Sequence, residues 1–278
     1  MDPTTLAPTV PELLDTWESA LASVADLAET LTPEEWAAAT PCPGWSVADV
    51  VAHTADIEAH FGGEPKPDHT PDWEALPHVT SPFGQFTELG VDYRRGRTQA
   101  EVIAELRART VARRAQLDEV PADGTVPGFS GGMVAISRFL RTRTFDIWAH
   151  EQDIRAAVGQ DGNWGNGPAV ISFQQMAGAL PHVWGKSVEA PVGSVVRVTV
   201  LGPELAAEFA ATIDDEGNAV AGDVLEGPDV HLACSWPDYM RMSCGRIDVH
   251  DAGLRERIDL HGDAVLAEAL LPALAITP

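Results

Sequence analysis

The N-terminal part of the chain carries apolar residues at helical spacing. Residues 9–30 repeat apolar side chains every three or four positions, and 98–119 and 139–158 show the same pattern. This periodicity is typical of amphipathic helices. Thr98-Gln-Ala-Glu101 has the spacing of a capping box, so the second of these helices is predicted to begin there. Further helices are predicted over residues 32–36, 46–61 and 168–184.

Two long segments between these helices lack any such pattern. Residues 62–97 are rich in Pro, Gly and His, and residues 121–132 are rich in Pro and Gly. We expect both to be loops, the first of which could cover the open end of a helical bundle.

The pattern changes towards the C-terminus. Residues 193–201 alternate apolar and polar side chains, which predicts a strand, and further strands are expected over 207–213 and 230–235. Helices are predicted over 237–244 and 263–274. The whole chain is therefore predicted to be an α+β protein.

The helix over 139–158 contains a polar pair, Asp146 and His150, at i and i+4. The two side chains lie about 40° apart around a helix, on one edge of its apolar stripe. Trp148 and Glu151 are predicted to point away from that stripe. An inward Asp/His pair either joins two helices by hydrogen bonds or supplies two of the three protein ligands of a metal site.

A third ligand is available on the helix that begins at Ser46. His53 lies on the edge of that helix's apolar face, whereas His60 is a weaker candidate beside the helix end. Asp56 is expected to be solvated. Cys42, in the loop before this helix, either lines the entrance of the site or is a buried structural thiol.

Composition narrows the functional classes. The net charge is −24, which disfavours binding to nucleic acid or to an anionic membrane. No apolar stretch is long enough to span a membrane, and no signal peptide is apparent, so we expect a cytoplasmic protein. Three scattered cysteines exclude a disulfide framework and a cysteine-type zinc site.

Two motifs, taken together, resemble a known family. These are Thr40-Pro-Cys-Pro-Gly-Trp-Ser-Val-Ala-Asp-Val-Val-Ala-His53 and Phe145-Asp-Ile-Trp-Ala-His-Glu-Gln-Asp-Ile-Arg155. They are similar to motifs of mycothiol-dependent maleylpyruvate isomerase-like proteins, within the DinB-like group of metal-binding four-helix bundles. The resemblance implies that His53, Asp146 and His150 bind a divalent metal, for which Zn²⁺ is the first choice. The characterised isomerases carry Glu where this chain has Asp146.

The resemblance also implies a domain order and a chemistry. It places a DinB-like helix bundle at residues 1–185 and a sterol carrier protein-like α+β domain at 186–278. In the second domain, Arg246 matches an arginine suspected of holding an anionic group, and we take it as a catalytic candidate. Mycothiol would be the thiol cosubstrate, adding to an electrophile in isomerisation or S-transfer.

Three further questions stay open at the level of sequence. Asp153 could orient His150 or form a salt bridge, and Arg246 could equally be a surface charge or a helix cap. A metal-binding or small-ligand-binding protein without turnover is one alternative function. A metal-dependent hydrolase is another.

Overall fold

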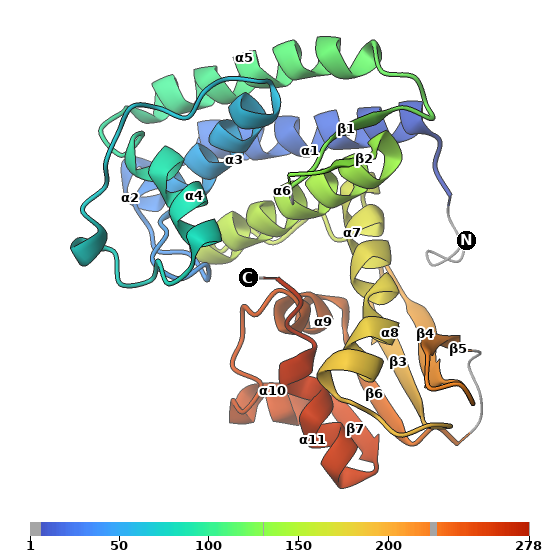
Figure 1. The fold of residues 1–278 in the computed structure, drawn as a ribbon. Coiled ribbons are helices and arrows are strands. Elements are labelled where there is room, and N and C mark those ends of the chain that lie inside the picture. The colour runs from blue at the N-terminus through green and yellow to red at the C-terminus, as the bar shows by residue number, and fades with distance from the viewer. Residues whose placement is uncertain (1–6, 130, 223–226, 278) are drawn as a thin grey trace. The chain divides into compact units, whose positions relative to one another are not determined.

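A computed structural model describes residues 7–129, 131–222 and 227–277, which fall into two compact units (Figure 1). The first unit is Pro8–Gly162, and the second holds the residues from Asn163 onward. The boundary expected from the sequence is at 185/186. The structure divides the chain earlier because Phe173 packs edge-on against Phe209 and Trp236, with ring centroids 5.6 and 5.4 Å apart.

The first unit is a helical bundle. Its helices are α1 (Val10–Thr30), α2 (Pro33–Trp36), α3 (Val47–Phe61), α4 (Pro82–Asp92), α5 (Gln99–Asp118) and α6 (Ile136–Val158). The long helix α1 packs on α5 and α6, and α3 packs on α4, α5 and α6 (Figure 1). The expected four-helix bundle, formed by α1, α3, α5 and α6, is confirmed.

Amphipathic patterning explains why these helices assemble. In α1, Leu13, Trp17, Leu21 and Val24 share one face and are fully buried. The capping box predicted for α5 is present: Glu101 N donates to Thr98 Oγ1 at 3.3 Å, and Thr98 N donates to Glu101 Oε2 at 2.8 Å.

The two predicted loops are partly wrong. Residues 62–97 contain α4 and a short 3₁₀ turn, η1 (Trp73–Ala75). The start signal for α4 is local, because Ser81 Oγ accepts from Gly84 N at 3.0 Å and Pro82 occupies the first turn. The second segment contributes to a small hairpin, in which β1 (Thr125–Pro127) pairs antiparallel with β2 (Met133–Ala135).

The second unit is built around a mixed sheet. Its strands are β3 (Val195–Leu201), β4 (Ala207–Ile213), β5 (Ala219–Gly222), β6 (Val230–Ser235) and β7 (Asp259–Gly262). They lie in the order β5-β4-β3-β6-β7, with β3 and β6 parallel and the other neighbours antiparallel. Its helices are α7 (Gly167–Gly178), α8 (Leu180–His182), α9 (Trp236–Ser243), α10 (Ala252–Arg257) and α11 (Ala264–Ala273).

The three predicted strands, at β3, β4 and β6, are confirmed, and so is the α+β fold class. The sequence did not reveal β5, β7 and α10, which are too short to show periodicity. The helix predicted over 168–184 is divided into α7, α8 and a π-helical turn, η2 (Val183–Ser187). Within the described residues, no helix combines the length and apolarity needed to cross a membrane.

Candidate metal centre

Helix α3 carries His53 into the interior of the bundle. Ser46 and Asp49 cap the helix reciprocally: Asp49 N donates to Ser46 Oγ at 3.3 Å, and Ser46 N donates to Asp49 Oδ2 at 2.9 Å. This cap determines where the helix begins and therefore which of its residues face inward. His53 is 5% exposed.

Helix α6 brings Asp146 and His150 to the same point. His53 Nε2 lies 3.9 Å from Asp146 Oδ2, and His150 Nε2 lies 3.7 Å from Asp146 Oδ1. The two imidazole rings meet edge-on with centroids 4.9 Å apart. One ligand atom from each residue lies within 4.8 Å of the others. The structure thus brings the three predicted residues together, while their role as metal ligands stays a prediction.

The spacing of these groups suits a small divalent cation. Zn²⁺ binds nitrogen and oxygen at about 2.0–2.2 Å, so tetrahedral ligand atoms lie about 3.4 Å from one another. The distances of 3.7 and 3.9 Å exceed this by little, and small side-chain rotations close the difference. Two imidazoles and one carboxylate are also a donor set that zinc uses when one position stays open.

The protonation of the site favours a cation. Burial lowers the pKa of His53, against the pull of Asp146, so its imidazole is neutral near pH 7. Burial opposes ionisation of Asp146, but the charge of Arg143 outweighs it and holds the pKa of that carboxyl well below its usual range. His53 therefore offers a neutral nitrogen and Asp146 an ionised oxygen.

A buried ion-pair chain supports Asp146 from behind. Arg143 and Glu58 are both fully buried, and Arg143 Nη2 donates to Glu58 Oε1 at 2.6 Å. Arg143 Nη1 also pairs with Asp146 Oδ2. The guanidinium thereby holds one carboxylate oxygen and leaves Oδ1 facing His150. The sequence analysis did not predict these ion pairs, although Arg143 precedes Asp146 at the i, i+3 spacing of a helical ion pair.

Asp153 and Cys42 lie on the other side of His150. Asp153 is 1% exposed, and its Oδ2 lies 3.2 Å from His150 Nδ1. A proton on Nδ1 would leave Nε2 free to face Asp146, so the orienting role considered for Asp153 fits its position. Cys42, His150 and Asp153 each place one ligand atom within 4.8 Å of the other two. The half-buried Cys42 therefore lies beside His150, and its place at the entrance of the site stays a prediction.

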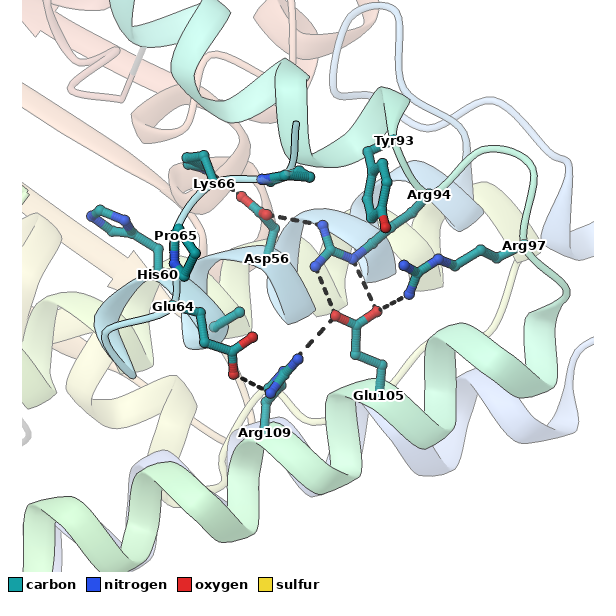
Figure 2. A pocket seen from close by; sticks show the side chains of 12 residues that line it. Asp56, His60, Glu64, Pro65, Lys66, Tyr93, Arg94, Arg97, Glu105 and Arg109 are labelled. Atoms are coloured by element: carbon teal, nitrogen blue, oxygen red, sulfur yellow. Dashed lines mark hydrogen bonds and ion pairs between the residues drawn. The ribbon is translucent and has the colours of Figure 1, made fainter. Parts of the chain in front are cut away.

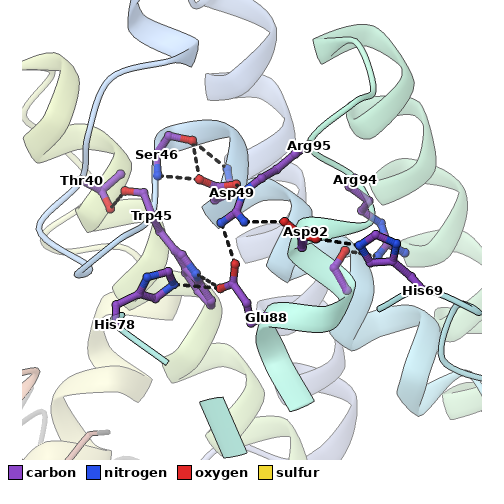
Figure 3. A network of polar contacts seen from close by, with 11 residues as sticks. Thr40, Trp45, Ser46, Asp49, His69, His78, Glu88, Asp92, Arg94 and Arg95 are labelled. Atoms are coloured by element: carbon purple, nitrogen blue, oxygen red, sulfur yellow. Dashed lines mark hydrogen bonds and ion pairs between the residues drawn. The ribbon is translucent and has the colours of Figure 1, made fainter. Parts of the chain in front are cut away.

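Trp45 forms a wall over both histidines. Its ring centroid is 4.9 Å from that of His53 and 5.9 Å from that of His150. Trp45 Nε1 donates to Glu88 Oε2 at 2.7 Å, and His78 Nε2 lies 3.1 Å from the same oxygen (Figure 3). Glu88 is 1% exposed and comes from α4, the helix that the sequence did not reveal.

The polar network of Figure 3 ties this wall to the start of α3. Arg95 forms an ion pair with Glu88 Oε1 at 2.7 Å, and it donates to Asp49 Oδ1 at 3.0 Å and to Asp92 Oδ1 at 2.7 Å. The wall also depends on Gly44, whose φ is +78° and where a Cβ would lie 2.3 Å from the His78 ring. Glycine is needed at position 44 because it alone adopts this positive φ without strain and leaves room for the His78 ring.

Comparison with known proteins places this site in a family. The model of the mycothiol maleylpyruvate isomerase N-terminal domain family matches residues 17–155, half of the 278-residue chain, and this range includes His53, Asp146 and His150. The chain belongs to this family. No curated protein sequence matches it.

Solved structures extend the comparison of the fold to nearly the whole chain. The crystal structure of the mycothiol-dependent maleylpyruvate isomerase is 16% identical, with 95% of this chain and 97% of that chain covered and a TM-score of 0.59. A histidine-to-alanine mutant of that enzyme matches at 15% identity, with the same coverage and TM-score. At this identity the likeness concerns the fold.

A sterol carrier protein 2 like 2 from Aedes aegypti also matches, at 23% identity over 38% of this chain and 97% of that chain, with a TM-score of 0.29.

Arg246, the catalytic candidate named from the sequence, lies in the second unit. It follows α9, is half-buried, and donates from Nη1 to Cys244 O at 2.9 Å. Its catalytic role stays a prediction. His60 lies in the last turn of α3 and lines a separate cavity with Asp56.

Three orientations expected from helical geometry are wrong. Asp56 is 2% exposed rather than solvated, because Arg94 pairs with it at 2.9 Å and Lys66 also contacts it. Trp148 and Glu151 are fully buried, since α1 covers the side of α6 that was expected to face solvent. Ser23 of α1 donates to Glu151 Oε1 at 2.8 Å.

Proposed function

We propose that this chain is a thiol-dependent enzyme of the mycothiol maleylpyruvate isomerase type and that His53, Asp146 and His150 hold a divalent metal, most simply Zn²⁺. The observation that carries the proposal is the convergence of two buried histidines and one ionised carboxylate from α3 and α6. The family match and the fold of the solved isomerase support the same conclusion.

The residues around the centre have separable roles in this proposal. When bound, the metal supplies a Lewis acid that keeps a thiol such as mycothiol ionised at neutral pH. Asp153 orients His150, and Arg143 holds Asp146 in place. Trp45 closes one side of the site against water. The thiolate would add to an electrophilic double bond, and its later departure would return the thiol after rotation about the resulting single bond.

Elemental analysis of the protein as purified tests the metal. We expect about one divalent metal ion per chain, lost in His53→Ala and in His150→Ala. His182→Ala is the matched control, because His182 is exposed on α8 in the other unit and its loss should leave the metal content unchanged. Full metal content in both site variants would contradict the ligand assignment.

Turnover tests the thiol chemistry separately. The metal-loaded protein is mixed with maleylpyruvate, with and without mycothiol, and loss of the substrate is followed. We expect turnover to require both metal and thiol. Bound metal without any thiol-dependent reaction would instead favour a binding protein or a metal-dependent hydrolase.

Arg246 is proposed to hold an anionic group of the substrate or thiol. Arg246→Gln should raise KM more than it lowers kcat, because an ion pair to a remote group contributes to binding. An unchanged KM would remove Arg246 from the site. The cytoplasmic location also remains a proposal, and cell fractionation tests it.

A further inference from the structure

A second polar cavity lies in the helical unit, apart from the residues of the candidate metal centre. Its volume is about 190 Å³, and its lining comes from α3, the segment that follows α3, the turn that follows α4, and α5 (Figure 2). The charged residues that line it are Asp56, Glu64, Lys66, Arg94, Arg97, Glu105 and Arg109. With four cations and three carboxylates, this lining has a formal charge of +1 in a chain whose net charge is −24.

One carboxylate stands at the centre of this arrangement. Glu105 accepts from Arg94 at 2.7 and 3.1 Å and from Arg97 at 2.6 Å, and Arg109 Nε lies 3.9 Å away (Figure 2). Burial opposes ionisation of Glu105, but the neighbouring arginines outweigh it and lower its pKa. Three guanidinium groups thus surround Glu105. Arg94 and Arg109 each pair with one further carboxylate, Asp56 and Glu64, whereas Arg97 pairs with Glu105 alone among the described residues.

The arginines retain hydrogen-bonding capacity that the protein does not use. Arg109 pairs with Glu64 through Nη1, but its Nε is buried and has no hydrogen-bond partner among the described residues. Within the same residues, Arg97 donates hydrogen bonds through Nη1 alone, while its guanidinium lies 4.8 Å from the Tyr93 ring centroid. Each guanidinium carries five N–H donors in a planar fork, so both can bind a further acceptor.

The other two carboxylates of the lining are themselves paired with cations, Asp56 with Lys66 and Arg94, and Glu64 with Arg109. Lys66 pairs with Asp56 and donates to Phe86 O at 3.0 Å. Burial and the charge of Lys66 lower the pKa of His60, which is therefore neutral near pH 7. The unused donors lie around a small polar space with a positive surplus. An oxyanion with two or three oxygens matches both the charge and the donor geometry.

We propose that this cavity binds the oxyanion group of a small molecule, a carboxylate or a phosphate, with Arg97 and Arg109 as its principal donors. The site is distinct from the proposed metal centre and does not depend on the proposed function. Arg94 and Glu105 form the base of the cavity, because Arg94 is 5% exposed and its guanidinium joins Glu105 to Asp56.

Isothermal titration calorimetry on the full chain tests this proposal. Inorganic phosphate and succinate are titrated separately at constant ionic strength, so that the two arms distinguish phosphate from carboxylate. We expect saturable binding of at least one of them. Arg97→Gln and Arg109→Gln should each weaken that binding roughly tenfold, because each removes a charge-assisted hydrogen bond.

Two control variants show whether the anion binds in this cavity. Arg107→Gln makes the same charge change on α5, where Arg107 is half-buried, pairs with Asp26 and Glu29 and does not line the cavity, and it should leave the affinity unchanged. His53→Ala removes a candidate metal ligand and should also leave it unchanged. Absence of saturable binding would overturn the proposal, and so would equal weakening by Arg107→Gln or loss of binding in His53→Ala.

Discussion

The carboxylate of Asp146 lies close to three side chains, those of Arg143, His53 and His150. Oδ2 faces Arg143 and His53, and Oδ1 faces His150. Asp is one methylene shorter than the Glu expected from the resemblance, so its carboxylate stays close to α6 and within reach of Arg143 on the same helix. A single residue thus links the buried ion pair of Arg143 and Glu58 to the proposed metal centre.

The lowered pKa of His53 predicts how the metal-free protein responds to pH. The unfolded chain binds a proton at His53 below about pH 6.5, whereas the folded state resists protonation because the ring is buried. The free energy of unfolding should therefore fall as pH drops from 6.5 towards 5, by up to about 1.4 kcal/mol per pH unit from this residue. Urea denaturation across this range measures the slope.

A substitution of His53 shows whether this residue causes the fall of the unfolding free energy with pH. His53→Gln should make the decline shallower, whereas His182→Gln, at an exposed position, should leave it unchanged. His60 and His231 also have lowered pKa values because of burial, and they supply the part of the decline that His53→Gln retains. Carboxylates such as Asp146 lose their stabilising charge only at lower pH, so measurements above pH 5 avoid them. A slope identical in wild type and His53→Gln would contradict this account.

At the scale of elements, the site depends on α4 as well as on the two helices that carry the ligands. Helices α3 and α6 supply His53, Asp146 and His150. Helix α4 supplies Glu88, whose carboxylate fixes the indole of Trp45 against both histidines. The wall and the ligands are therefore built from separate parts of the bundle and can be perturbed independently.

Glu88→Gln tests the contribution of α4. The amide has one oxygen and no charge, so it cannot both accept from Trp45 and pair with His78 and Arg95 as the carboxylate does. We expect the free energy of unfolding to fall by about 1–3 kcal/mol. Metal affinity, measured by competition with a chelator, should fall roughly 10- to 100-fold because the histidines lose their support.

The matched control for Glu88 is an exposed glutamate. Glu119→Gln, just after α5, changes the same charge outside the network and should alter neither quantity. Wild-type stability and wild-type metal affinity in Glu88→Gln would show that α4 does not support the site.

At the scale of the whole molecule, the excess of acidic residues dominates. There are 42 Asp and Glu residues against 18 Lys and Arg, so like charges repel one another across the folded surface. Some of the few basic residues lie close together, since Lys66, Arg94, Arg97 and Arg109 all line one cavity. Local ion pairs therefore coexist with a repulsive overall charge.

Salt should stabilise this protein. Raising NaCl from about 20 to 200 mM shortens the Debye length to below about 10 Å and screens the overall repulsion. The melting temperature should rise by roughly 2–4 °C for each kcal/mol gained. A thermal melt series measures it, with sucrose at equal osmolarity as the control. A falling melting temperature would mean that local ion pairs outweigh the net charge.

Local patterns in the sequence determined several parts of this protein. Helices α1 and α5, the cap at Thr98 and strands β3, β4 and β6 follow from periodicity and turn chemistry, which act over a few residues. The motif at His53 and the spacing of Asp146 and His150 identified the three residues that the structure brings together. The family resemblance stated on those motifs is confirmed.

Only the tertiary structure decided what surrounds these residues. A helical pattern shows one apolar face, but Trp148 and Glu151 are buried because α1 covers another side of α6. Likewise, Asp56 is buried by Arg94, and Trp45 is held by Glu88, through contacts between residues far apart in the chain. Burial and pairing depend on how many neighbours an element meets, and that number is a property of the assembled bundle, which no single segment encodes.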